Sequence, residues 1–323
     1  MNPLSLDPAN TPSCYPDAAP NNPGAYYWKI YSDNAPEALQ YYGKKIVYFS
    51  LNAQNIFQYR TSPILPHSLA KDKVLSLASK VLSLASSAFI EISCLAYCVG
   101  VYLTSSKEAT PLHTKDPDKR RVPILLVHGY IHNNSAWGYM KNELHEAGHG
   151  PIYTINLKSF RSSIPEFAKQ VQKRVQKIEK ETGVKSIKLI GHSMGGVVCA
   201  YYTENLAKKG KVSHIVTIAS PLKGTHIASF GIGKCAKQIR RHSPFTRSLI
   251  KKITQNTSTK YFHIASKVDV FILPYYSSLT GRDESRELLV EDRGHVSLMT
   301  FCPQVPETIT RWLDDSEDIA EIL

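Results

Sequence analysis

Cysteine is scarce in this sequence, and its positions are scattered. The chain of 323 residues contains six cysteines, with no C-x-x-C pair and no spacing typical of metal ligands. They are Cys14, Cys94, Cys98, Cys199, Cys235 and Cys302. This pattern indicates neither a disulfide framework nor a zinc site, so we expect a reducing compartment and a protein without metal or cofactor.

The N-terminal region lacks the features of a secretory signal peptide. Residues 1–24 are rich in Pro, Asn, Asp and Ala, with no basic start and no apolar core. Such a composition predicts a disordered or loosely held tail. A tyrosine-rich stretch with no clear period follows, so residues 1–70 are interpreted as a tail and a Tyr-rich segment without assigned structure.

Charge is nearly absent from residues 81–103, where Glu91 is the single charged residue. A helix of about 20 apolar residues spans a bilayer core, so residues 74–104 predict an apolar helix that is embedded in or crosses a membrane. Glu91 is costly in hydrocarbon and the serines lower the hydropathy, which leaves open a helix packed on a soluble, cytoplasmic domain. Because Lys and Arg are more numerous in the linker 105–121 than before the helix, a spanning helix would hold the C-terminal domain on the cytoplasmic side.

Acidic residues are also absent from residues 223–252, although the chain as a whole carries 27 of them against 39 Lys and Arg. Here basic residues alternate with apolar ones, which is typical of a segment that contacts an anionic membrane surface. We therefore predict a cap or lid over residues 224–255. The alternative is a helix pair whose apolar residues cover a sheet. No nucleic-acid recognition motif accompanies the formal net charge of +12, so we expect no nucleic-acid ligand, and nothing indicates an obligate protein partner.

From residue 122 onwards, short apolar runs alternate with amphipathic stretches. The runs 122–127, 151–156, 186–190, 214–218, 261–265 and 287–290 are predicted to be strands. Between two of them, Phe167, Val171, Val175 and Ile178 form one apolar face of a helix. This alternation predicts an α/β domain over residues 122–323, with a mostly parallel sheet and helices on both faces.

The sequence IGHSMGGVV, residues 190–198, follows one of these strands directly. A strand that ends in G-x-S-x-G and continues as a helix must turn sharply, and glycines leave room for the turn. Ser193 would stand at its tip, with the amides of the following helix directed towards any charge that develops there. The alternative is an ordinary strand-to-helix turn with a solvated serine.

Two further residues have the chain order that a serine nucleophile requires. Asp269 follows one predicted strand and His295 follows the next, so these two are predicted as the acid and the base that activate Ser193. Asp283 and Asp292 are rivals for the acid.

The oxyanion of the reaction also needs donors placed in advance. The amides of Tyr130, after the strand 122–127, and of Met194 are predicted to supply them, and Gly129 would let the backbone approach the substrate. We expect His128, Gly129 and His192 to line the substrate site. His128 alone is also compatible with a buried histidine bonded to the backbone.

Residues 122 to about 312 resemble the α/β-hydrolase superfamily, and within it the bacterial triacylglycerol lipases and related membrane-lipid deacylases. The resemblance rests on PILLVHGYIHNNSAWGYMKNELHEAGH, IKLIGHSMGG, IVTIASPLKGTHIA and the segment from ASKVDVFILP to GHVSLM. It implies a metal-free lipase or esterase with Ser193, Asp269 and His295 as the triad. A thioesterase or lipid-anchor deacylase with the same triad, and a membrane-tethered scaffold without catalysis, remain as alternatives. The first 120 residues have no counterpart in the family, and no calcium-ligand cluster is evident.

Overall fold

The computed structural model describes residues 91, 92, 94, 110–113, 122–158, 161–300 and 302–314. The predicted tail and Tyr-rich segment, most of the predicted apolar helix 74–104 and most of the linker 105–121 lie outside the described residues. No helix within the described ranges is both long enough and apolar enough to cross a membrane.

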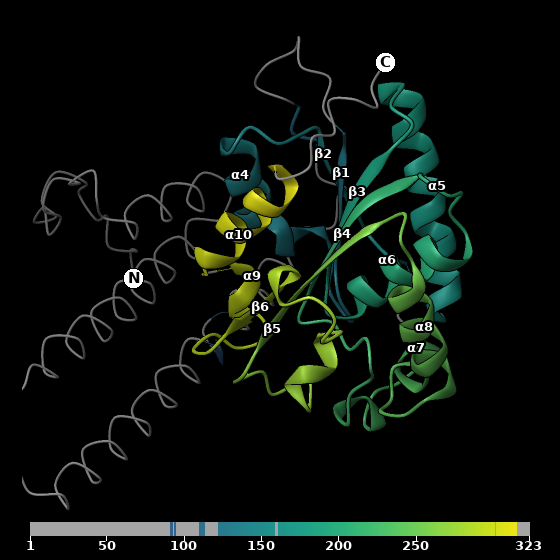
Figure 1. Ribbon diagram of the computed structural model, residues 1–323, viewed down its shortest axis with the longest axis vertical. Coiled ribbons are helices and arrows are strands. Elements are labelled where there is room, and N and C mark those ends of the chain that lie inside the picture. Colours follow the sequence, from purple (N-terminus) through teal and green to yellow (C-terminus); the bar gives the residue numbers. More distant parts are fainter. Residues whose placement is uncertain are drawn as a thin grey trace, which may run out of the picture.

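Six parallel strands form one sheet in the order β2-β1-β3-β4-β5-β6 (Figure 1). Each lies within two residues of a predicted strand, so the α/β prediction is confirmed. The bounds are β1 Ile124–Val127, β2 Ile152–Ile155, β3 Ile187–His192, β4 Val212–Ile218, β5 Lys260–Ser266 and β6 Glu287–Val290. Because all strands run in the same direction, the loops that follow β1, β3, β4, β5 and β6 meet at one edge of the sheet.

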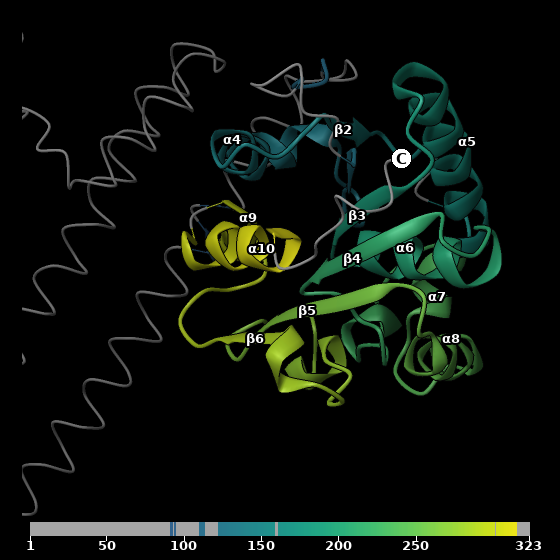
Figure 2. The same cartoon turned by 45° about the horizontal axis from the view of Figure 1, so that its top comes forward.

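Helices cover both faces of this sheet, as the two views in Figures 1 and 2 show. One face carries α5 Ile164–Thr182, α6 Met194–Asn205, α7 Lys234–Gln238 and α8 Pro244–Gln255. The other carries α4 Gly138–Glu146, α9 Ser297–Thr300 and α10 Gln304–Asp314. Short 3-10 turns complete the domain at η2 Asn134–Trp137, η3 Ile227–Ser229, η4 Tyr275–Ser278 and η5 Glu284–Arg286. Each layer buries its own cluster of apolar side chains against the sheet.

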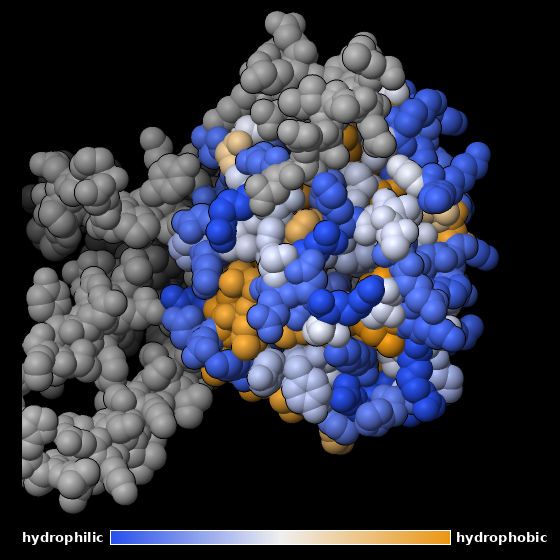
Figure 3. Space-filling model, viewed as in Figure 1, coloured by the Kyte–Doolittle hydropathy of each residue, from blue (hydrophilic) through white to orange (hydrophobic). Residues whose placement is uncertain are grey.

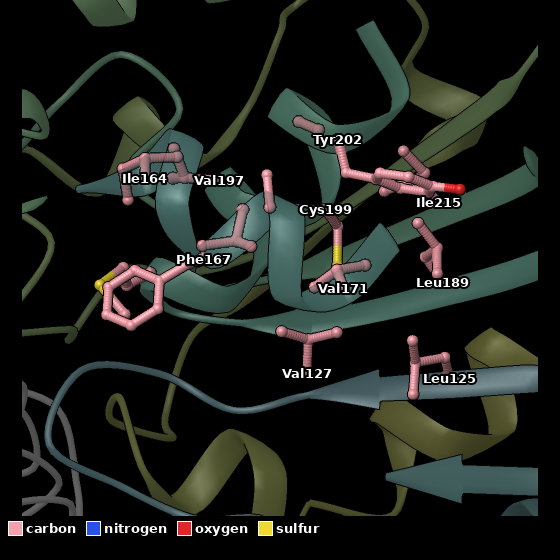
Figure 4. Close-up of a cluster of buried hydrophobic side chains, with 14 of the residues drawn as sticks. Leu125, Val127, Ile164, Phe167, Val171, Leu189, Val197, Cys199, Tyr202 and Ile215 are labelled. Atoms are coloured by element: carbon pink, nitrogen blue, oxygen red, sulfur yellow. The ribbon is translucent and has the colours of Figure 1, made fainter. Parts of the chain in front are cut away.

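The helix α5 shows how the sequence specifies this packing. The Ser163 hydroxyl accepts from the amide of Glu166, whose carboxylate in turn accepts from the amide of Ser163, and Gly183 ends the helix in a left-handed conformation. Its apolar face, including Phe167 and Val171, lies over β1 and β3 next to α6 (Figure 4). These contacts fix α6, and therefore Ser193 directly before it, against the sheet.

The predicted cap 224–255 divides into two parts. Residues 244–255 do not form a cap, because α8 packs against α6 and buries Leu249 and Ile253 in the cluster that covers the sheet. Its basic side chains Arg247 and Lys251 face solvent on the opposite side. The apolar face of α8 is covered by the protein itself. Residues 225–233 belong to the loop region after β4, at the carboxyl edge of the sheet.

The surface is mostly hydrophilic on the face shown in Figure 3. A hydrophobic area lies left of the centre of this view, over the region where Figure 1 places α9 and β6. The loop between these two elements contains His295. The carboxyl edge of the sheet is therefore the part of the domain where the predicted site residues have to be sought.

Candidate active site

Ser193 occupies a strained backbone position between β3 and α6. Its φ of 55° and ψ of −129° lie in a region that L-residues rarely adopt and that costs about 1–3 kcal/mol. The amide of Ser193 donates to the carbonyl of Ile218 in β4 at 2.8 Å, which holds the turn against the sheet. The side chain of Ser193 is half-buried.

The glycines around Ser193 permit contacts that no side chain would allow. A Cβ on Gly195 would lie 2.2 Å from the carbonyl oxygen of Val127, and one on Gly196 would lie 2.1 Å from the Oγ of Ser220. Both distances are far below van der Waals contact. The first turn of α6 is therefore pressed directly onto the ends of β1 and β4, which places Ser193 at the carboxyl edge.

Asp269 and His295 form a buried pair beside this turn. The Nδ1 of His295 lies 2.8 Å from Oδ2 of Asp269, and the two side chains are 8% and 1% exposed. A carboxylate can only accept, so Nδ1 carries the proton and Nε2 is left as a proton acceptor. This is the tautomer that a general base next to a serine requires.

The carboxylate of Asp269 is held on its other side as well. Its Oδ1 accepts from the amides of Phe271 and Ile272 at 2.8 and 2.9 Å. Its rivals are placed differently: Asp283 caps the amide of Ser285 on the surface, and Asp292 pairs with Arg293. Of these three acids, Asp269 is the one that the fold brings to His295.

The surroundings of His295 act on its pKa in opposite directions. Burial lowers it, but the charge and hydrogen bond of Asp269, together with the charge of Glu91, outweigh burial and hold the pKa of His295 above its ordinary value of 6.5. The ring of Phe271 packs on the imidazole with ring centres 5.1 Å apart. The protonated form of His295 is thus stabilised.

Ser193 and His295 make no hydrogen bond with each other in this structure, although both are described. They are linked through His192, whose Nε2 lies 3.0 Å from the main-chain oxygen of His295 and whose ring centre lies 4.7 Å from that of His295. Catalytic hydrogen bonds are often long in ligand-free sites and shorten when substrate binds. Burial, followed by the neighbouring His295, holds the pKa of His192 well below its ordinary value, so His192 is neutral.

His128 is engaged with the backbone at both ring nitrogens. Its Nε2 accepts from the amide of Leu157 at 2.9 Å, and its Nδ1 contacts the carbonyl of Gly129 at 2.9 Å. Burial lowers its pKa to about 4, so the ring is neutral. His128 therefore holds the loop after β1 in place, in agreement with the backbone-bonded alternative for this histidine.

The loop after β1 also places the predicted oxyanion donors. A Cβ on Gly129 would lie 2.8 Å from the Cβ of Ser193, so this glycine brings the backbone next to the serine. Tyr130 follows it, and the Tyr130 hydroxyl donates to the carbonyl of Ile232 at 2.6 Å. Met194 begins α6. The loops after β1 and β4 are thus tied together above Ser193.

Comparison with known proteins supports the fold. Residues 133–270 match the family described as "Alpha/beta hydrolase of unknown function (DUF915)". The mature lipase BlEst2 of Bacillus licheniformis superimposes with a TM-score of 0.53 at 16% identity, over 64% of this chain and 99% of the lipase. The protein has the α/β-hydrolase fold.

Proteins with sequences similar to this chain include named enzymes. The triacylglycerol lipase of Burkholderia plantarii is 27% identical over 165 residues, which are 49% of this chain and 45% of the lipase. The lysosomal thioesterase PPT2-B of Xenopus laevis is 28% identical over 108 residues, which are 32% of this chain and 37% of the thioesterase. The chain spans less than half the length of either relative.

Two features of the candidate site were not predicted. Glu91, which was considered only for its cost in a membrane, lies beside the His295 loop. Exposed apolar side chains also surround the site, on the loops after β1, β4 and β5. They are Ile131, Phe230, Ile232, Val270, Phe271 and Leu273, and are called the apolar rim below. Among the described residues no cluster of His, Cys, Asp and Glu could hold a metal ion.

Proposed function

We propose that this α/β-hydrolase is a serine hydrolase that cleaves carboxylic esters of lipid-like substrates. The hydrogen bond between Asp269 and His295 carries the proposal, because it joins two residues 26 positions apart in the tautomer that a serine nucleophile needs. The strained backbone of Ser193 supports it, since such strain is stored mainly at functional sites.

In the proposed reaction, the Oγ of Ser193 attacks the ester carbonyl and Nε2 of His295 takes its proton. The amides of Tyr130 and Met194 donate to the oxygen that becomes negative. His295 then gives the proton to the leaving alkoxide, and Ser193 keeps the acyl group as an ester. Water, deprotonated by His295, releases the acid and restores Ser193. Throughout, Asp269 stabilises the imidazolium and remains ionised.

A thioester is the second candidate substrate, since one relative is a thioesterase. The same steps apply, with a thiolate as the leaving group. A thiolate needs less help from the acid form of His295 because it is a much weaker base than an alkoxide. Relative rates on an ester and a thioester of the same acid therefore decide between the two candidates.

We further propose that the protein is membrane-associated and that the apolar rim is the surface that meets the lipid. Hydrogen bonds join the loops that carry the rim. Thr225 Oγ1 donates to the carbonyl of Phe271, and the amide of His226 donates to the carbonyl of Leu273. Phe230 and Ile232 are 86% and 65% exposed. Because Lys234 and Lys237 are exposed on α7 directly after Ile232, an anionic membrane fits this surface best.

Activity-based labelling tests the proposed function directly. A fluorescent fluorophosphonate should label the full chain, and p-nitrophenyl esters from short to long chain should be hydrolysed. Ser193→Ala should remove labelling and lower turnover by about 10⁴-fold or more while the far-UV circular dichroism stays unchanged. A folded wild-type chain that neither reacts with the probe nor cleaves any ester or thioester would instead indicate a scaffold without catalysis.

A further inference from the structure

Glu91 contacts the loop that contains His295, at Val296, which lies 205 residues further along the chain. Its Oε1 accepts from the amide of Val296 at 2.6 Å, and its Oε2 accepts from the amide of Ser297 at 3.1 Å. Both partners are buried, and within the described ranges they have no other acceptor for these amides. One carboxylate therefore satisfies the two amides that immediately follow His295.

Gly294 and Cys94 lie close to this contact. A Cβ on Gly294 would lie 2.5 Å from Oε2 and 2.6 Å from Cδ of Glu91, so only glycine leaves space for the carboxylate here. On the same segment, Cys94 is 2% exposed, and burial raises the pKa of its thiol while the side chain of Thr300, at the end of α9, lowers it. Residues 294–300 thus lie close to both Glu91 and Cys94.

Glu91 also adds a negative charge next to the imidazole. Its charge is one of the influences that raise the pKa of His295. The other titratable groups that act on this ring are Asp269, from the loop after β5, and the neutral His192, at the end of β3. Arg293 lies on the His295 loop itself and is paired with Asp292.

We propose that Glu91 is a positioning residue for catalysis, through which the segment before the hydrolase domain fixes the His295 loop and stabilises the imidazolium. The inference rests on the proposed serine-hydrolase function. Glu91 does not touch the reacting atoms. It acts through the backbone of Val296 and Ser297 and through its charge.

Three variants of the full chain test this role. Glu91→Ala removes both acceptors and the charge, and kcat on a soluble ester should fall about 10-fold with little change in KM, since a loosened base reduces the fraction of productive complexes. Glu91→Gln keeps the size and one oxygen acceptor, so it should fold and retain kcat to within about threefold. Ile92→Ala, which changes a neighbouring side chain that is 67% exposed, is the matched control and should behave like the wild type.

The pH profile separates positioning from a merely structural contact. General-base catalysis needs neutral His295, so kcat/KM rises with pH through the pKa of His295. Because the Glu91 charge raises that pKa, Glu91→Gln should shift the acid limb of kcat/KM to lower pH. Ile92→Ala should leave the limb in place.

Gly294 offers an independent variant. The Cβ of Gly294→Ala would displace the Glu91 carboxylate, so this substitution should reproduce the loss of kcat caused by Glu91→Ala. Combined with Glu91→Ala it should add little, because the displaced group is already absent. If the losses of kcat in the two single variants were fully additive in the double variant, they would not both arise from the missing Glu91 contact.

The outcomes distinguish this inference from the proposed function. If the wild type is active, but Glu91→Gln leaves the acid limb unmoved and Glu91→Ala keeps full kcat, the positioning role is refuted and the hydrolase stands. If the wild type has no activity, the proposed function fails. Titration of the His295 imidazole by NMR in the wild type and in Glu91→Gln then decides whether the charge acts on the ring.

Discussion

The imidazole of His192 donates its Nε2 proton to the main-chain oxygen of His295, 3.0 Å away. His192 is the last residue of β3 and directly precedes Ser193, so this bond joins the serine turn to the loop of its base. The carbonyl can only accept, and His192 is buried and neutral. The relative position of Ser193 and His295 therefore depends on a residue that was predicted to contact substrate.

The variant His192→Phe should distinguish the effect of this hydrogen bond from the effect of the contact between the two rings. Phenylalanine keeps an aromatic ring against His295 but leaves its carbonyl without a donor, so kcat on a short soluble ester should fall about 10-fold. The rate of fluorophosphonate labelling at Ser193 should fall in parallel. His226→Phe, which alters an exposed histidine, is the control. Unchanged labelling by His192→Phe would show that the bond has no part in alignment.

Asp269→Asn should identify the acid of the triad. Asparagine keeps the shape but lacks the charge and favours the wrong imidazole tautomer, so turnover should fall roughly 10³- to 10⁴-fold. Asp283→Asn, in which an exposed acid is changed in the same way, should stay close to the wild type. Steady-state kinetics on one ester compares the two variants, and a reversed order would assign the acid to Asp283.

Gly196→Ala should destabilise the domain although alanine is the better helix former. An alanine normally gains about 1 kcal/mol over glycine inside a helix, but here its Cβ would meet the Oγ of Ser220 at 2.1 Å. We expect a net loss of about 2 kcal/mol in the free energy of unfolding, measured in urea. Adding Ser220→Gly should recover part of this loss. A double variant no more stable than Gly196→Ala would place the strain elsewhere.

The sequence predicted the strands of the sheet because strands depend on local patterns. Apolar runs define strands, and parallel strands bring the residues after them, such as Asp269 and His295, to one edge. What covers an amphipathic helix is not a local property. The basic side of α8 faces solvent in either interpretation, and only the packing of Leu249 against α6 shows that its apolar side covers the sheet. The contact of Glu91 with Val296 spans 205 residues, so no local pattern could indicate it.

The buried histidines predict how stability depends on pH. Burial lowers the pKa of His263 to about 4, and its Nδ1 contacts the Thr217 hydroxyl at 2.8 Å. Between the ordinary value of 6.5 and about 4, the unfolded chain binds a proton that the folded chain does not, so acidification through this range lowers stability. The raised pKa of His295 has a different effect. Its contribution to stability is constant below pH 6.5 and is lost as the pH rises above this value.

Urea unfolding at several pH values between 7 and 5 measures this dependence. We expect the wild type to lose on the order of 1–3 kcal/mol for each such histidine over the interval. His263→Asn keeps a polar group near Thr217 but does not titrate. It should start from a lower stability at pH 7 and show a shallower decrease. Equal slopes for the two proteins would exclude His263 as a source of the pH dependence.

The apolar rim should matter for lipid surfaces and not for soluble esters. Phe230→Ser and Ile232→Ser each remove an exposed apolar side chain whose transfer to hydrocarbon contributes ~1–3 kcal/mol, so the affinity for anionic vesicles should fall about 10-fold or more. Turnover of a long-chain ester presented in those vesicles should fall with it, while turnover of a soluble short-chain ester stays unchanged. Arg247→Gln, on the solvent face of α8, is the control, because it changes an exposed residue outside the apolar rim.

Salt separates the contribution of charge from that of the rim. Attraction by Lys234 and Lys237 is screened when salt shortens the Debye length, whereas apolar insertion is not. If the rim inserts, the ratio of wild-type to Phe230→Ser affinity should persist at high ionic strength, although both affinities decrease. Vesicle sedimentation of the full chain gives this ratio. A ratio that disappears in high salt would mean that charge alone holds the protein to the surface, and the rim would then be free to serve the acyl chain of the substrate instead.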